Sequence, residues 1–151
     1  TALAHTHQRR VIHGDVKPEN LILLADDTLR LADFGLAKHS ARTLQASSSG
    51  TVGYVAPEQA MGRPSARSDV FSAGLIVYRM LAGVLPEWPY RWPLEGHARL
   101  RRTAPDLVPF LQRALQLDAR RRFRNAVPML SAFRVAPKAT LRRLERRRRR
   151  S

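Results

Sequence analysis

Hydrophobic residues recur along this chain mostly at the spacing of helices. The longest such segment runs to about Ala82, and Gly83 is typical of a residue just past a helix end. Ser68 and Asp69 both suit the N-cap at its start. The segment is apolar on nearly every side, so we expect this helix at the buried centre of the fold.

Shorter segments predict the remaining elements. Two apolar runs, residues 21–24 and 29–31, flank the turn residues Asp26 and Asp27 and predict a hairpin whose first strand belongs to the core. Residues 11–12 predict a further short β segment. Other helices are expected at residues 1–10, from Pro57 onward, at 106–117, and at 126–135 after an entry through Pro128. The expected fold class is therefore mainly α with a small β-hairpin.

Two segments follow no regular pattern. Residues 37–53 are rich in Ser, Thr and Gly, and a loop of this length needs a functional reason. Residues 88–93 are rich in proline and aromatic residues. We favour Trp88 and Trp92 as a cover for the apolar base of the domain, with a docking surface for protein partners as the alternative.

The composition is that of one folded domain. The chain has 151 residues, of which 44% are hydrophobic, enough for a single core. It has no cysteine, which excludes disulfides and favours a reducing, cytoplasmic location. The best candidate for a membrane span, residues 70–85, is short and includes Arg79, so we expect no span.

Positive charge concentrates at the C-terminal end. The net charge is +15, and residues 138–151 contain eight basic residues and one acidic residue. We therefore divide the chain into a domain at residues 1–135 and a basic, arginine-rich tail at residues 136–151. The run from Arg146 to Arg150 can attract an anionic partner such as nucleic acid without specificity, and a solvated extension is the favoured interpretation.

One stretch carries a distinctive set of chemical groups. Residues 13–20 read His-Gly-Asp-Val-Lys-Pro-Glu-Asn, and residues 33–35, after the expected hairpin, read Asp-Phe-Gly. In phosphoryl transfer an Asp orients a hydroxyl, a Lys neutralises the phosphoryl group, and an Asn with a second Asp binds Mg²⁺. Asp and Asn favour loops in general, but the ordered set in both loops is far more specific than a lone Asp-Phe-Gly.

The two loops resemble the catalytic and magnesium-binding loops of eukaryotic-like Ser/Thr protein kinases. The resemblance implies that Asp15 is the catalytic base or hydroxyl-orienting residue and that Lys17 reaches the γ-phosphate of ATP. It implies Mg²⁺ ligands at Asn20 and Asp33, and an adenine pocket with Ile22 as its floor. The residues it implies for nucleotide binding are Lys17, Glu19, Asn20, Ile22 and Asp33.

Two later matches extend the resemblance. Residues 50–58, Gly-Thr-Val-Gly-Tyr-Val-Ala-Pro-Glu, resemble the end of the kinase activation loop. There Thr51 is implied to bond to the catalytic Asp and Lys, a feature of Ser/Thr kinases. Residues 118–123, Asp-Ala-Arg-Arg-Arg-Phe, are similar to the family pattern Asp-Pro-x-x-Arg. This similarity implies a structural ion pair between Glu58 and Arg122, suited to a buried position.

The start of the central helix also resembles that of the family. Asp69 is implied to anchor the backbone of the catalytic loop, and His13 to stack with Phe34. The matches cover about residues 1–133 and imply the C-terminal lobe of a kinase. The Gly-rich loop, strand Lys and helix Glu that a kinase also needs do not occur in the chain. We therefore expect part of a longer protein, which the opening Thr1 also indicates. Residues 86–89, Pro-Glu-Trp-Pro, resemble a bacterial subgroup of these kinases.

Two positions depart from the family pattern. Gly14 stands where most members have an Arg that meets a phosphate on the activation loop. Arg10 stands where the family often has Gly, so we expect it to adopt a positive φ at a small cost.

Three functions are compatible with these patterns. The first is a Ser/Thr protein kinase that, in the intact protein, moves the γ-phosphoryl of ATP to protein Ser or Thr hydroxyls. The alternative is a catalytically inactive, truncated lobe that serves as a protein- or nucleic-acid-binding module. The third is a dedicated nucleic-acid binder built on the run from Arg146 to Arg150, although no aromatic residue interrupts this run to read bases.

The glycine at position 14 predicts activity that does not depend strictly on phosphorylation of the loop. Single alanine replacements of Ser47, Ser48 and Ser49 in the intact protein should leave kinase activity close to that of the wild type. Transfer of phosphate to a protein substrate measures this, with Thr51→Ala tested alongside. The prediction fails if one of the serines proves indispensable.

Overall fold

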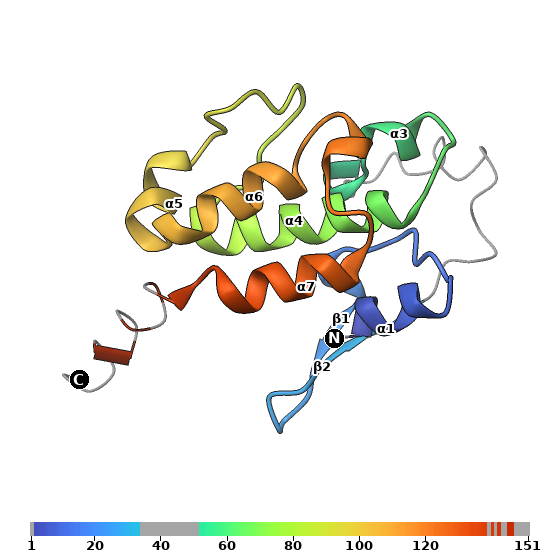
Figure 1. Ribbon diagram of the computed structural model, residues 1–151, viewed down its shortest axis with the longest axis horizontal. Coiled ribbons are helices and arrows are strands. Elements are labelled where there is room, and N and C mark those ends of the chain that lie inside the picture. Colours follow the sequence, from blue (N-terminus) through green and yellow to red (C-terminus); the bar gives the residue numbers. More distant parts are fainter. Residues whose placement is uncertain (1, 34–51, 139, 141, 143–144, 147–151) are drawn as a thin grey trace.

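The computed structural model describes residues 2–33, 52–138, 140, 142 and 145–146. They form a mainly helical domain with a two-stranded antiparallel sheet (Figure 1), which confirms the expected fold class. The helices are α1 (Ala2–Gln8), α3 (Pro57–Ala60), α4 (Ala66–Ala82), α5 (His97–Thr103), α6 (Val108–Ala114) and α7 (Ala126–Val135). The strands are β1 (Leu21–Leu23) and β2 (Leu29–Leu31), and 3-10 turns lie at Pro18–Asn20, Val52–Tyr54, Pro105–Leu107 and Ala119–Arg121.

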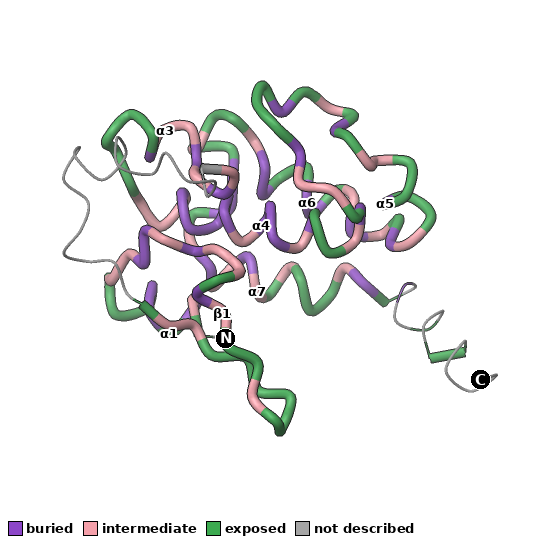
Figure 2. The backbone as a smooth tube through the Cα atoms, turned by 180° about the vertical axis from the view of Figure 1, so that it is seen from behind, coloured by how far each residue is buried: buried purple, intermediate pink, exposed green. Residues whose placement is uncertain are grey.

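Helix α4 is the centre of the fold, as predicted. Val70, Phe71 and Leu75 on this helix are fully buried, and α5, α6 and α7 all pack against it. Figure 2 shows the same distribution along the backbone, with burial concentrated on α4 and its neighbours and exposure at the tip of the hairpin. The expected burial is wrong for Met80 near the C-terminal end of the helix, which is 77% exposed.

Helix α4 begins earlier than the sequence suggested. Its N-cap is Ser65, whose Oγ accepts a hydrogen bond from the Arg67 N–H at 3.2 Å. The Ser68 Oγ in turn accepts from the Ser65 N–H at 3.0 Å, so the two serines cap the helix reciprocally. Ser68 and Asp69 therefore lie inside the first turn, and the prediction that one of them is the N-cap is wrong. Gly83 ends the helix as predicted, at φ 80°.

The other helices match their predictions to different degrees. Helix α7 has the predicted bounds, whereas α6 and the 3-10 turn before it end three residues short of residue 117. Helix α5 was not predicted, because Leu100 is its one buried residue and its pattern is dominated by basic side chains. The expected β segment at residues 11–12 is wrong, since the structure has no strand there and the Val11 N–H bonds back to the Thr6 carbonyl.

The register of the hairpin determines how the two sequence motifs approach each other. Leu21 lies opposite Leu31 across the two strands. The Ala32 N–H donates to the Asn20 carbonyl at 2.8 Å, which continues the pairing one step beyond the strands. The end of the catalytic-type loop and the residue before Asp33 are therefore joined directly.

The strands of the hairpin are less buried than expected. Ile22 is 48% exposed and Leu23 67% exposed, so the prediction that the first strand belongs to the core is wrong for these two residues. A three-residue strand in a two-stranded sheet has too few neighbours to cover both of its faces.

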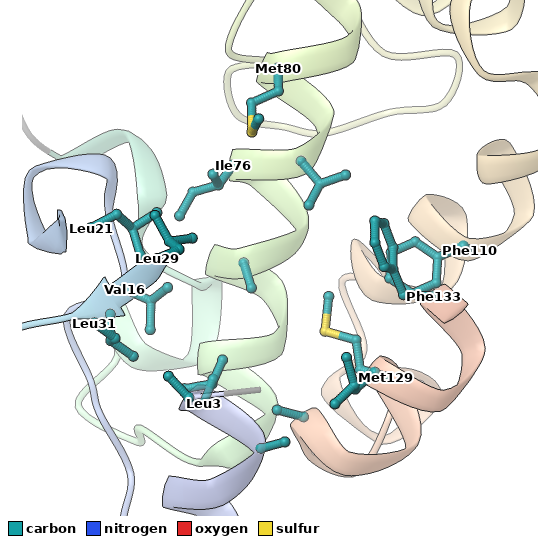
Figure 3. Close-up of a pocket in the computed structure, with 16 residues that line it drawn as sticks. Leu3, Val16, Leu21, Leu29, Leu31, Ile76, Met80, Phe110, Met129 and Phe133 are labelled. Atoms are coloured by element: carbon teal, nitrogen blue, oxygen red, sulfur yellow. The ribbon is translucent and has the colours of Figure 1, made fainter. Parts of the chain in front are cut away.

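An apolar cavity of about 360 Å³ lies between the hairpin, α1, α4 and α7 (Figure 3). Leu3, Leu31, Ile76 and Met129 are among the side chains that line it, and no charged residue does. Phosphoryl transfer needs charged groups, so this cavity is not the candidate site.

Aromatic residues from the loop between α4 and α5 cover the base of the domain. Trp92 packs edge-on against Tyr78 with ring centroids 6.0 Å apart, and Tyr90 packs edge-on against Phe71 at 5.3 Å. These contacts confirm the covering role for Trp92. The same expectation is wrong for Trp88, which is 66% exposed.

Part of the expected tail packs against the domain. Pro137 and Thr140 are buried, and the Thr140 N–H donates to Oδ2 of Asp106 at 3.1 Å. The division of the chain at residue 135 stays a prediction, and most of the run from Arg146 to Arg150 lies outside the described residues. None of the described helices combines the length and the apolar character that crossing a membrane requires.

The predicted ion pair between Glu58 and Arg122 ties α3 to the segment before α7. Arg122 donates from Nη1 to Oε1 of Glu58 at 2.7 Å and from Nη2 to Oε2 at 3.0 Å. The Arg122 side chain is fully buried, and the Ser68 hydroxyl donates to the same carboxylate at 2.8 Å. The bidentate geometry confirms the prediction.

This pair predicts how stability depends on pH. Burial raises the pKa of Glu58, but hydrogen bonds from Arg122, from its own backbone and from Ser68 outweigh it and leave the pKa below its ordinary value of 4.5. The pair therefore contributes stability above that ordinary pKa and loses it as the pH falls through the lowered one.

We expect Glu58→Gln to reduce the free energy of unfolding by about 3 kcal/mol at neutral pH, because Arg122 then stays buried without its charge partner. The variant should also lose less stability than the wild type on acidification. Urea unfolding at neutral pH and below about pH 4 measures both effects. The same acid-induced loss in both proteins would contradict the assignment.

Candidate active site

The loop after α1 brings three of the predicted side chains together. Nζ of Lys17 lies 3.2 Å from Oδ2 of Asp15. Nδ2 of Asn20 donates to the same Oδ2 at 3.1 Å and to the Asp15 carbonyl at 2.7 Å. The 3-10 turn at Pro18–Asn20 turns the chain back so that Asn20 reaches Asp15. One carboxylate oxygen thus faces both a cation and an amide donor.

His13 joins this loop to the end of the hairpin. Its buried ring accepts a hydrogen bond at Nδ1 from the Asp15 N–H at 3.2 Å, and its Nε2 lies 3.0 Å from the Ala32 carbonyl oxygen. Since Nδ1 accepts, the proton is on Nε2, which donates to Ala32. Ala32 precedes Asp33, so one ring fixes the backbone beside both predicted acidic residues.

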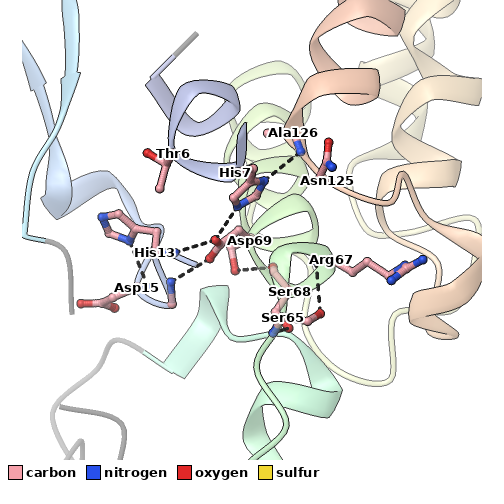
Figure 4. Close-up of polar contacts among 12 residues, drawn as sticks. Thr6, His7, His13, Asp15, Ser65, Arg67, Ser68, Asp69, Asn125 and Ala126 are labelled. Carbon is pink, nitrogen blue, oxygen red and sulfur yellow. Dashed lines mark hydrogen bonds and ion pairs between the residues drawn. The ribbon is translucent and has the colours of Figure 1, made fainter. Parts of the chain in front are cut away.

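Asp69 anchors the loop from α4, as the resemblance implied (Figure 4). Oδ2 accepts from the His13 N–H and Oδ1 from the Gly14 N–H, both at 2.8 Å. A third donor is Nε2 of His7 on α1, 2.8 Å from Oδ2, and the side chains of this pair are each 1% exposed. Three N–H groups therefore replace water around a buried carboxylate.

His7 is a positioning residue that the sequence did not reveal. Its Nδ1 accepts from the Ala126 N–H at 2.9 Å, which leaves the proton on Nε2 for Asp69. One ring thus connects α1, α4 and the first residue of α7 (Figure 4). A signal was available, because His7 follows Leu3 by four residues and so shares its face of α1. That signal predicts burial but does not name a partner.

Two backbone positions near the loop lie in the left-handed region. Gly14 has φ 75° and Arg10 has φ 59°. The positive φ of Arg10 confirms the expectation. Glycine adopts this conformation without the penalty that a Cβ brings, so Gly14 suits its place in the loop.

Asp33 and Asn20 are the predicted metal ligands. Asp33 is exposed, with φ 52°, and within the described residues no hydrogen bond or ion pair joins it to Asp15 or Lys17. The amide nitrogen of Asn20 is committed to Asp15, so its amide oxygen is the atom left for a metal. A carboxylate and an amide oxygen are hard donors of the kind that Mg²⁺ prefers, so the pair fits this ion. No cluster of three or more His, Cys, Asp or Glu suited to a metal occurs in the described part of the chain.

The remaining predicted site residues are placed as follows. Glu19 is exposed in the turn before Asn20, and Ile22 is half-exposed on β1. Thr51 and Phe34 lie outside the described residues. The roles of all these residues in nucleotide binding and catalysis stay predictions.

Comparison with known proteins identifies the family of the chain. The family model for the protein kinase domain matches residues 1–124, from α1 to just before α7. This chain belongs to the protein kinase family.

Curated relatives of the chain include bacterial and eukaryotic kinases. It is 38% identical over 140 residues to "Serine/threonine-protein kinase C" of Synechocystis sp., covering 84% of this chain and 26% of that protein. It is 34% identical over 146 residues to "Serine/threonine-protein kinase PknA" of Nostoc sp., with coverage of 88% and 26%. It is 32% identical over 135 residues to "Aurora kinase" of Yarrowia lipolytica, with coverage of 82% and 36%. The chain therefore spans about a quarter to a third of the length of these relatives.

The three donors around Asp69 predict a large cost for Asp69→Asn. The side-chain amide of an Asn has one oxygen and one NH₂ group. Its NH₂ group would face one of the three N–H donors around position 69, so that buried donor would have no acceptor. We expect the free energy of unfolding to fall by about 3 kcal/mol, measured by urea unfolding. The matched control is Asp27→Asn in the exposed hairpin turn, where Asn tolerates the φ of 61°. Equal effects of the two substitutions would contradict the anchoring role.

Proposed function

We propose that this chain supplies the catalytic loop of a Ser/Thr protein kinase, which transfers the γ-phosphoryl group of ATP to a Ser or Thr hydroxyl of a protein substrate. The observation that carries the proposal is the convergence of Lys17 and Asn20 on one oxygen of Asp15. The names of the bacterial relatives support the Ser/Thr class. Because the chain spans only part of those relatives, the activity is proposed for the intact protein.

Asp15 orients the nucleophile in this proposal. Its Oδ2 is occupied by Lys17 and Asn20, which leaves Oδ1 to accept a hydrogen bond from the substrate hydroxyl. As the hydroxyl oxygen bonds to the γ-phosphorus and the bond to the ADP oxygen breaks, the hydroxyl proton passes to the carboxylate. Lys17 lies close enough to compensate negative charge on the transferring group. The loop contributes mainly orientation and electrostatic stabilisation.

The nucleotide and its metal would meet the other end of the same loop. Asn20 and Asp33 would hold Mg²⁺, which when bound neutralises charge on the phosphates. The half-exposed side chain of Ile22 offers an apolar surface to adenine. Glu19, exposed beside Asn20, completes the proposed nucleotide-binding set with Lys17.

Removing either acidic group tests the proposal. In the intact protein, Asp15→Ala should lower kcat by about 10²- to 10⁴-fold, the range for loss of a positioned acid–base group. Asp33→Ala should also lower kcat strongly, because the proposed Mg²⁺ site loses its carboxylate ligand. The measurement is transfer of labelled γ-phosphate from ATP to a protein substrate. The exposed hairpin variant Asp27→Asn serves as the control and should keep wild-type turnover.

The outcomes separate the kinase from the inactive binding lobe, the first two of the three functions compatible with the sequence. Wild-type turnover by either alanine variant would refute the assigned roles. A folded wild-type protein that transfers no phosphate would favour a lobe that only binds partners.

A further inference from the structure

Gln59 links the end of the activation segment to the catalytic-type loop. It lies on α3, next to Glu58, which fixes this helix through its ion pair with Arg122. Its side chain is buried and reaches the loop instead, where Nε2 donates to the Gly14 carbonyl oxygen at 2.5 Å. The two residues are 45 positions apart in the sequence.

This contact completes a set of bonds around the peptide group between Gly14 and Asp15. The carbonyl oxygen of that peptide accepts from Gln59, and its N–H, which belongs to Asp15, donates to Nδ1 of His13. The preceding peptide is held by Asp69, which accepts from the Gly14 N–H. Side chains therefore bind both polar atoms of the peptide that precedes Asp15. Because this peptide is fixed, the Cα–Cβ bond of Asp15 is directed toward the position that its carboxylate occupies.

The hydrogen bond from Gln59 restrains a peptide group that Gly14 itself cannot restrain. Gly14 has φ 75° and no side chain, so its own bulk restricts the rotation of this peptide little. A small space of about 10 Å³ lined by Gly14, Asp15, Tyr54 and Gln59, with other residues, leaves room for at most about one water molecule. Little water can therefore replace the Gln59 donor, and the side-chain hydrogen bonds from Gln59 and to His13 orient the peptide.

We propose that Gln59 is a positioning residue that couples the placement of α3 to the orientation of Asp15 without a phosphate group. Helix α3 includes the last residues of the segment that resembles the end of the activation loop, so a displacement of that helix withdraws the donor from the Gly14 carbonyl. The peptide can then rotate and carry Asp15 out of alignment. This inference rests on the proposed kinase function.

The test removes the donor while keeping the shape of the side chain. In the intact protein, Gln59→Met should lower kcat by about 10- to 100-fold, the scale of a small misplacement of a catalytic group, and leave KM for ATP unchanged. Gln59→Glu should lower kcat further, because a carboxylate next to the Gly14 carbonyl repels it. The matched control is Gln112→Met on the exposed face of α6, which should retain wild-type kinetics.

A second measurement needs no activity. In Gln59→Asn the side chain is one methylene shorter and cannot reach Gly14, so the amide hydrogen of Asp15 should exchange with solvent faster than in the wild type. The Gly14 amide, bound to Asp69, should keep its protection. If Gln59→Met does not fold, the exchange rates of the Asp15 and Gly14 amides in Gln59→Asn test the inference in its place.

Each outcome has one meaning. An active wild type with equal kcat in Gln59→Met, or unchanged Asp15 exchange in Gln59→Asn, overturns the inference alone. A fall in kcat that is matched by a raised KM and a lower Tm than in the Gln112→Met control shows a purely structural role and also overturns it. An inactive wild type overturns the proposed kinase function, whatever the exchange data show.

Discussion

The structure depends on one buried carboxylate that must not be left without partners. Asp69 lies on the central helix, away from water, and an unpaired charge there would cost several kcal/mol. Its three N–H donors come from two other parts of the chain, His7 on α1 and the backbone of His13 and Gly14 in the loop. The carboxylate is therefore satisfied only when α1, α4 and the loop are assembled together. This requirement makes the placement of the loop a condition of folding rather than a later adjustment.

The groups proposed for chemistry and the groups that hold them occupy different environments. Asp15 and Lys17 are partly exposed, with side-chain exposures of 36% and 25%, and so remain open to a substrate. His13, Asp69 and Gln59 lie beneath them and are buried. The buried groups bond to backbone atoms of the loop rather than to the reactive side chains. The buried groups thus orient the loop, and the exposed side-chain atoms of Asp15 and Lys17 remain free of bonds to them.

Local pattern predicted the elements, and its failures have local reasons. The hairpin, the end of α4 at Gly83 and the bounds of α7 follow from apolar spacing and turn residues. The start of α4 was misplaced because Ser68 is part of a reciprocal cap that begins at Ser65. The predicted triad of Asp15, Lys17 and Asn20 lies within six residues, which a motif can specify. His7 and Gln59 meet partners 62 and 45 residues away, and no local pattern encodes such pairs.

The hairpin has a tip that tolerates inserted residues and paired strands that do not. Asp26 and Asp27 form an exposed tip, and residues added between them leave Leu21 opposite Leu31. One residue added within β2, between Leu29 and Leu31, would instead place these two leucines on opposite faces of the strand and, where the paired tip is kept, move the Ala32 carbonyl away from His13. Length differences accumulated in evolution should therefore collect at this tip. For the same reason the tip is the place where a foreign peptide could be inserted into the chain without disturbing the candidate active site.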